Sequence, residues 1–209
     1  MISTEFIVLT KQPYRETSLL LNGFSPDFGR TALVAQGAMK ISEKNFPEAD
    51  LYRELSVEFN EDKPGDLFTA RRMELITAFD GVADVPNHFK MAARIGSFLL
   101  KNVAPGVPMP YTYDTLRSVL TQLSGGAVEA QWNLTQCAVV LKAVFLYENG
   151  MLPEVEDPRS SEFLEELIAA GIENSPLPEC PPEYWSALNN WLSSLLNANG
   201  YFLFGGKRK

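Results

Sequence analysis

Apolar and polar residues alternate along the first 80 positions with the period of two that is typical of β-strands. In residues 51–60, Leu, Arg, Leu, Val and Phe alternate with Tyr, Glu, Ser, Glu and Asn. Apolar runs at 6–9, 18–24 and 31–35 indicate three earlier strands. Residues 67–79 indicate a fifth strand, whose expected shared side consists of Leu67, Thr69, Met73, Leu75 and Phe79. Five short strands predict a small closed barrel such as an OB-fold or, almost equally well, a small sandwich.

The period becomes helical near Asn87, which is the expected N-cap of a first helix. The proline-rich stretch 104–110 ends this helix, and further helices are predicted over about 114–123, 129–149, 161–170 and 182–199. The third of the five helices is apolar around most of its circumference and should be the buried centre. We therefore expect an α+β protein with a β domain at residues 1–80 and an all-helical domain at residues 81–209.

The formal net charge of -8 argues against a surface wholly dedicated to phosphate binding. The negative charge is concentrated, however. Between Glu148 and Glu183 the chain has ten acidic residues and one base, Arg159, a balance of -9. The rest of the chain sums to +1, so a modest nucleic-acid-binding patch in the first half is compatible with the composition.

The residues that usually carry catalysis or bind metals are sparse. The chain has one histidine, His88, and no Gly-rich phosphate loop, GxSxG or HExxH motif. Glu165 and Glu166 are neighbours on a predicted helix, where they point about 100° apart and do not form an acid/base pair. Cys137 and Cys180 lack the paired spacing of zinc ligands. We predict a protein that is not an enzyme and has no catalytic residues, metal or cofactor.

The chain also lacks the sequence signals of membrane insertion and secretion. It has no run of about 18 apolar residues that could span a bilayer. Its first residues lack the basic and apolar regions of a signal peptide. We therefore expect a cytoplasmic protein that does not act at a membrane.

Three ordered segments near the amino terminus resemble a known family. They are PYxETSLLL at residues 13–21, F-S/T-x-x-x-GR at 24–30 and LVAxGA at 33–38. They resemble the amino-terminal domain of the RecO family of bacterial recombination mediators, and residues 138–153 are similar to the end of the family's "LLxxLGYxP" helix. The resemblance implies an amino-terminal five-stranded OB-fold barrel joined to a helical domain, which favours the barrel over the sandwich.

The resemblance also implies a function and partners. It implies a protein that binds single- and double-stranded DNA, assists strand annealing and helps to load a recombinase. The implied protein partners are a RecR-like protein and the tail of the single-stranded-DNA-binding protein. The chain differs from many members, since residues 154–161 hold none of the cysteines of the family's zinc module. In the basic loop after the third strand, Gln36 and Met39 replace a lysine and an arginine.

OB barrels bind single strands through a basic groove and through aromatic rings on which bases stack. The residues of these types in the β domain are Lys11, Tyr14, Arg15, Phe28, Arg30, Lys40, Lys44 and Arg72. A solvated surface is the alternative interpretation of the bases, and Tyr14 would equally well close the barrel end. Strand alternation predicts that Arg72 is exposed and Arg71 faces the other way. It also predicts that Glu54 and Glu58 are exposed, where they would repel phosphate.

These observations together predict a RecO-like recombination mediator that binds DNA through its OB domain and docks proteins through its helical domain. The alternative is a non-catalytic interaction scaffold that kept the fold but lost useful DNA binding.

Overall fold

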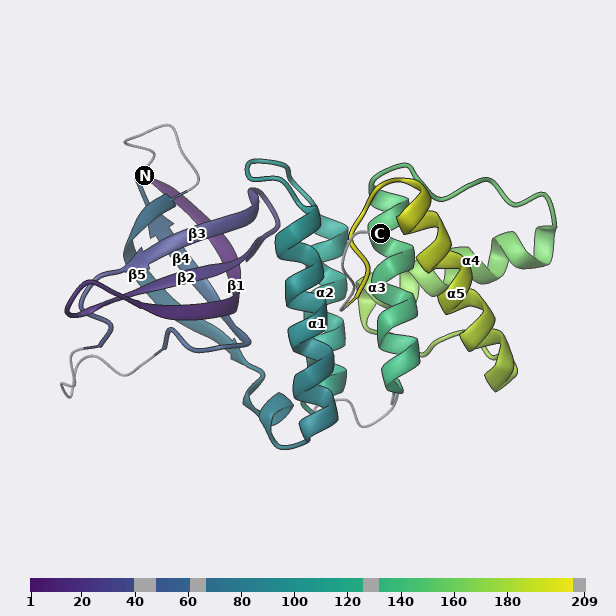
Figure 1. Cartoon of the computed structure of the whole chain (residues 1–209), viewed down its shortest axis with the longest axis horizontal. Coiled ribbons are helices and arrows are strands. Elements are labelled where there is room, and N and C mark those ends of the chain that lie inside the picture. The colour runs from purple at the N-terminus through teal and green to yellow at the C-terminus, as the bar shows by residue number, and fades with distance from the viewer. Residues whose placement is uncertain (40–47, 61–66, 126–131, 205–209) are drawn as a thin grey trace. The chain divides into compact units, whose positions relative to one another are not determined.

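A computed structural model describes residues 1–39, 48–60, 67–125 and 132–204 (Figure 1). The chain divides into two compact units. The barrel unit comprises Met1–Asp80 and Leu99–Pro110, and the helical unit comprises Gly81–Phe98 and Tyr111–Lys209.

Five strands form the barrel unit's sheet: β1 (Ile2–Tyr14), β2 (Ser18–Ser25), β3 (Gly29–Ala35), β4 (Arg53–Phe59) and β5 (Leu67–Ala78). They close in the order β1-β2-β3-β5-β4. The pair β3 and β5 is parallel, and the other neighbouring pairs are antiparallel. This closed sheet, followed by helices, confirms the predicted OB-fold and α+β class and excludes the sandwich.

The inward-facing apolar side chains of all five strands fill the barrel. Its fully buried members include Phe6, Val8, Leu21, Leu33, Leu55, Val57 and Phe59. Gly23 of β2 allows this close packing, because a side chain there would collide with the Ile7 carbonyl and the Phe6 ring.

The sequence predicts that five residues at and after the start of β5 share one side, and this prediction is wrong. The five residues are Leu67, Thr69, Met73, Leu75 and Phe79. The register with β4 slips at Arg71, an extra residue between the paired positions Ala70 and Arg72. Such a β-bulge reverses the alternation of side chains beyond it. Phe68 and Met73 therefore pack against the barrel core, whereas Leu67 is 49% exposed.

The expectation that Glu54 is exposed on β4 is also wrong, because Glu54 is only 1% exposed. Glu54 lies directly opposite Ile7 of β1, which is fully buried. Both side chains point outward from the barrel, so this part of the barrel wall is covered. Alternation identifies the outer face of a strand, but it does not show whether that face meets water.

The helices follow a short 3-10 turn at Asp80–Ala83. They are α1 (Pro86–Asn102), α2 (Pro110–Leu123), α3 (Leu134–Glu148), α4 (Pro158–Glu173) and α5 (Pro182–Ala198). Asn87 is not an N-cap, because α1 already begins at Pro86, whose fixed φ suits a first helical turn. The same property of Pro110 starts α2 four residues before the expected position.

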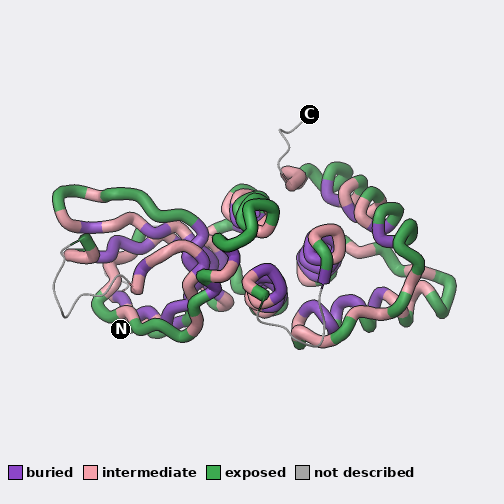
Figure 2. Tube along the Cα trace, turned by 90° about the horizontal axis from the view of Figure 1, so that it is seen from below, coloured by how far each residue is buried: buried purple, intermediate pink, exposed green. Residues whose placement is uncertain are grey.

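Helix α3 is the buried centre of the helical unit, as the sequence predicts. Every residue from 137 to 146 is buried (Figure 2). A capping box between Asn133 and Gln136 fixes its start. The Phe145 ring lies 4.9 Å from that of Phe98 and 5.1 Å from that of Tyr201, measured between centroids. Within the described residues, no helix is both long and apolar enough to cross a membrane.

Candidate nucleic-acid interface

The turn between β1 and β2 presents an exposed arginine beside an aromatic ring. Tyr14 pairs with Ser18 across the hairpin, and Arg15 takes a left-handed conformation with φ of 56°. The Arg15 guanidinium carbon lies 5.3 Å from the centroid of the half-buried Tyr14 ring, which is a cation–π distance. The backbone N–H of Met39 donates to the carbonyl of Thr17 at 3.0 Å, so the segment after β3 lies against this turn.

Lys11 lies on the same end of the hairpin, three residues before Tyr14. Its Nζ atom is 2.5 Å from Oδ1 of Asp50, and the two side chains are 36% and 38% exposed. Partial burial alone would raise the pKa of Asp50, but hydrogen bonds from Lys11 and the Leu51 N–H outweigh it and lower the pKa. The Lys11 charge is therefore partly neutralised by Asp50 but still reaches solvent.

Two of the predicted binding residues instead hold the barrel unit together. Nη1 of the half-buried Arg30 donates to the Leu100 carbonyl at 3.1 Å, near the end of α1. The Phe28 ring packs against the core and meets the Phe59 ring edge-on, with centroids 5.6 Å apart. The Phe28 carbonyl also accepts from the Gly106 N–H. These contacts give Arg30 and Phe28 a structural role in the barrel unit that does not require DNA.

Arg72 is exposed, as predicted, but it lies on an acidic part of the barrel wall. It forms an ion pair with Glu74 two residues along β5, and Glu58 of β4 is directly opposite it. Arg71 is exposed too, contrary to the expectation, because it is the bulged residue. Residues 1–80 contain nine Lys and Arg against thirteen Asp and Glu, a balance of -4. This face of the barrel is therefore a poor path for a phosphate backbone.

The predicted residues do not form one cluster. Lys11, Tyr14 and Arg15 share the end of the β1–β2 hairpin, and we call them the hairpin site. Lys40 and Lys44 lie outside the described residues.

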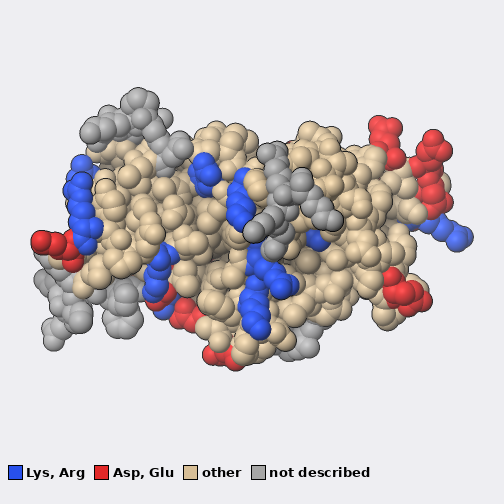
Figure 3. Space-filling view, in the orientation of Figure 1, with Lys and Arg blue, Asp and Glu red and all other residues tan. Residues whose placement is uncertain are grey.

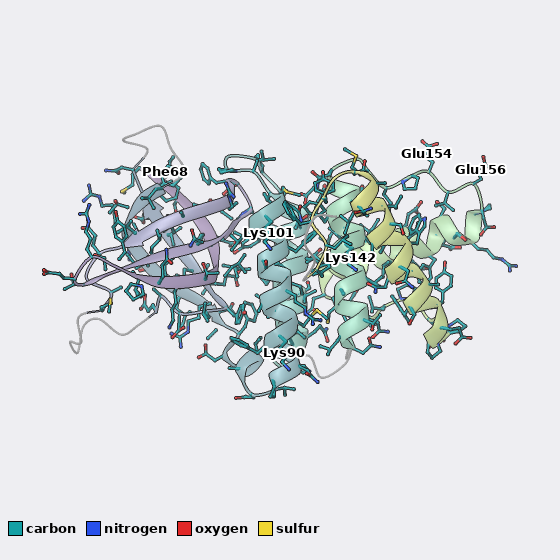
Figure 4. All side chains as sticks on the ribbon, in the orientation of Figure 1. Phe68, Lys90, Lys101, Lys142, Glu154 and Glu156 are labelled. Carbon is teal, nitrogen blue, oxygen red and sulfur yellow. The ribbon has the colours of Figure 1, made fainter. Side chains whose placement is uncertain are left out.

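A basic stripe on α1 is a feature that the sequence reasoning missed. Lys90, Arg94 and Lys101 are all exposed, and at 100° per residue they fall within about 40° of one another around the helix. Helix α1 contains no Asp or Glu. Figure 3 shows basic side chains gathered over α1, on which Figure 4 labels Lys90 and Lys101. The signal was present in the sequence as bases at helical spacing without an intervening acid.

The groups with possible reactive chemistry have structural surroundings. Nδ1 of His88 donates to the Leu123 carbonyl at 2.7 Å and so caps the end of α2. Burial raises the pKa of the Cys137 thiol to about 12, which keeps it protonated and unreactive. Across the described ranges, no group of three His, Cys, Asp or Glu side chains could hold a metal ion.

Residues 1–79 match the family model described as Recombination protein O N terminal. The match spans all five strands of the barrel, including the hairpin site. A search of curated proteins found no match. The barrel topology and the matched residues agree, and the amino-terminal barrel of this chain is similar to the amino-terminal domain of the RecO family.

Proposed function

We propose that this protein is a recombination mediator in DNA repair that binds single- and double-stranded DNA and assists annealing and recombinase loading. The observation that carries the proposal is the family match over the whole barrel. The family is one of non-catalytic mediators, and the structural surroundings of His88 and Cys137 fit that role. A RecR-like protein and the tail of the single-stranded-DNA-binding protein are the proposed protein partners.

We place the primary DNA contact at the hairpin site. The exposed Arg15 supplies a cation, and Lys11 supplies a second one at the same hairpin end. Tyr14 supplies an aromatic ring on which a base could stack once Arg15 turns to a phosphate. Two phosphate contacts would give a logarithmic salt slope of about -1.4 on single strands, and further contacts elsewhere on the barrel would steepen it. Such a slope describes a weak, salt-sensitive site that depends on partners for tight binding.

The test is salt-dependent binding of a labelled single-stranded oligonucleotide to the full chain. The double variant Lys11→Gln/Arg15→Gln should lower affinity about tenfold or more at low salt and flatten the slope by about 1.4, since each lost phosphate contact on a single strand removes about 0.7. Tyr14→Leu should weaken binding by about 1–3 kcal/mol without changing the slope, because stacking releases no counterions.

Matched variants separate a local site from an effect of overall charge. Arg71→Gln/Arg72→Gln removes the same two charges from the acidic wall and should leave binding within about twofold of wild type. Lys90→Gln/Arg94→Gln tests the stripe on α1. Loss of binding in that pair alone would move the contact from the hairpin site to α1.

The competing function is an interaction scaffold without useful DNA binding. The acidic balance of residues 1–80 and the ion pair at Arg72 favour it. If wild-type protein shows no binding even at low salt, the scaffold function replaces the proposal.

A further inference from the structure

An apolar groove separates α4 from α5 in the helical unit. It is lined by Val155 before α4, by Ser160 and Leu164 of α4, and by Tyr184, Ala187, Leu188 and Trp191 of α5. The α5 residues follow the spacing i, i+3, i+4, i+7, which places them on one face of the helix. Tyr184 is 40% exposed although its ring is aromatic.

Hydrogen bonds and ring contacts hold two of the groove's lining residues, Ser160 and Tyr184. Oδ2 of Asp157 accepts from the Ser160 N–H at 3.0 Å and from the Ser160 hydroxyl at 2.6 Å, which fixes the start of α4. The Phe163 ring meets the Tyr184 ring edge-on at 5.3 Å and lies 6.0 Å from the Trp185 ring. The groove is therefore preformed, and little entropy is lost in ordering it when a ligand binds.

The groove is slightly smaller than a typical small-molecule pocket. Its volume is about 260 Å³. Pockets for small-molecule ligands usually measure about 300–1,000 Å³ and enclose most of the ligand. An open, apolar groove of this size suits one or two apolar side chains of a peptide segment.

Four acidic residues are direct sequence neighbours of the groove's lining residues, and we call them the acidic rim. Glu154 and Glu156 flank Val155, Glu165 follows Leu164, and Glu183 precedes Tyr184. All four side chains are exposed, and Figure 4 labels Glu154 and Glu156 in the loop that leads into α4. Arg159 is the single base between residues 148 and 183, and residues 184–199 are uncharged. A ligand at this groove therefore meets a net negative field.

We propose that this groove docks a basic amphipathic segment of a partner protein. One or two apolar side chains of the segment occupy the groove, and its Lys or Arg residues lie against the acidic rim. This is helix-in-groove recognition with charge complementarity, in which the apolar anchors supply affinity and the charges supply orientation and specificity. The same rim repels an acidic segment, so an acidic tail docks elsewhere. The proposal does not depend on DNA binding by the barrel.

The probe is a short, fluorescently labelled amphipathic peptide of leucine and lysine, with a twin in which every lysine is glutamate. Binding to the full chain is measured by fluorescence anisotropy at low and moderate salt. The basic peptide should bind, and the acidic twin should bind at least about tenfold more weakly, a difference of about 1.4 kcal/mol. Equal binding of the twin, or no binding of the basic peptide at low salt, overturns the proposal.

Two variants locate the site. Ala187→Trp fills the groove from an exposed helical position and should lower affinity for the basic peptide about tenfold. Ala169→Trp adds the same bulk to an exposed position of α4 that does not line the groove, and it should change affinity less than about twofold. Equal effects of the two overturn the proposal, and a circular dichroism melt identifies a variant that has unfolded.

A second pair tests the rim without adding bulk. Glu154→Gln/Glu156→Gln should lower the affinity for the basic peptide about threefold to tenfold at low salt. The loss should be smaller at high salt, because salt already screens the attraction that the variant removes. Glu16→Gln/Glu58→Gln makes the same net-charge change in the barrel unit and should have no effect beyond about 1.5-fold. Equal weakening by both pairs would mean that the peptide responds to net charge only, and the groove would not be its site.

Discussion

Lys11, Arg53 and Arg72 of the barrel unit each lie within ion-pair distance of an Asp or Glu, as does Arg117 of α2, whereas two other stretches of the chain carry charges of mostly one sign. Helix α1, whose last turns belong to the barrel unit, carries three bases and no acid, and residues 148–183 carry ten acids and one base. Figure 3 shows the acidic side chains gathered around the approach to α4 and the basic ones over α1.

The comparison shows why the net charge of -8 describes neither unit well. A base paired with a carboxylate produces little field beyond its own pair. Charges of one sign on one element add up, and their field extends about one Debye length, about 8–10 Å at physiological salt. Single charge changes at the ion pairs should therefore have weak effects, and charge changes on α1 or within residues 148–183 should have stronger ones.

The largest expected effect concerns a buried charge in the helical unit. Lys142 of α3 is 4% exposed, and both of its hydrogen-bond acceptors are neutral. Its Nζ lies 2.7 Å from Oδ1 of Asn189, 2.9 Å from Oγ of Ser193 and 4.9 Å from the centroid of the Phe204 ring. Burial lowers the pKa of Lys142 from 10.5 to about 8. The unfolded chain therefore binds more protons than the folded one between about pH 8 and 10.5, and stability rises with pH across that window.

Lys142→Met should remove this dependence. The Lys142 contribution to the free energy of unfolding should grow by on the order of 2–3 kcal/mol between pH 7 and 10, following about 1.4 kcal/mol per unit of pKa difference. The measurement is urea unfolding of wild type and variant at several pH values. The difference between the two proteins cancels the opposite effect of Cys137, whose raised pKa lowers stability above pH 9. A constant difference across this range would contradict the prediction.

The sequence predicts the barrel and its fold family because these rest on many consistent positions. Five alternating runs and three ordered segments all point to the same architecture, so a few exceptions do not change it. Single positions depend on tertiary context instead. Glu54 has the pattern of an exposed strand residue, but the covered wall beside Ile7 buries it. The bulge at Arg71 reverses the faces of β5 without a glycine or proline to signal it.

The candidate site was less predictable than the fold for a related reason. A basic residue in a sequence does not reveal whether its charge meets solvent or a carbonyl. Arg15 and Arg30 look alike in the sequence, but Arg15 is exposed at a turn, whereas Arg30 donates to Leu100, 70 residues away. Lys142 lies within a run of apolar residues, and the partners that hold it come from α5. Such long-range contacts decide function and leave no local pattern.

A smaller effect separates two ion pairs within the barrel unit. Arg53 reaches Asp80 in a bidentate contact, Nε to Oδ1 at 3.1 Å and Nη2 to Oδ2 at 2.9 Å, and its side chain is 16% exposed. Lysine cannot reproduce that fork, so Arg53→Lys should cost about 0.5–1 kcal/mol. Arg72→Lys, at a pair exposed on both sides, should cost less than about 0.3 kcal/mol. Chemical denaturation compares the two variants, and equal costs would show that the bidentate geometry contributes nothing.

The smallest expected effect is that of the acidic residues of α4 on DNA binding. Neutralising Glu162, Glu165 and Glu166 of α4 changes the net charge from -8 to -5 without altering the hairpin site. Affinity for a labelled single strand should stay equal or rise by no more than about twofold at low salt, and the difference should vanish at high salt. Glu16→Gln is the matched test. Removing this one negative charge beside Arg15 in the hairpin turn should tighten DNA binding at least as much as neutralising all three glutamates of α4. Weaker binding by the triple variant would mean that α4 takes part in the DNA-bound state. The acidic charge of α4 would then act on DNA as well as on the proposed peptide ligand.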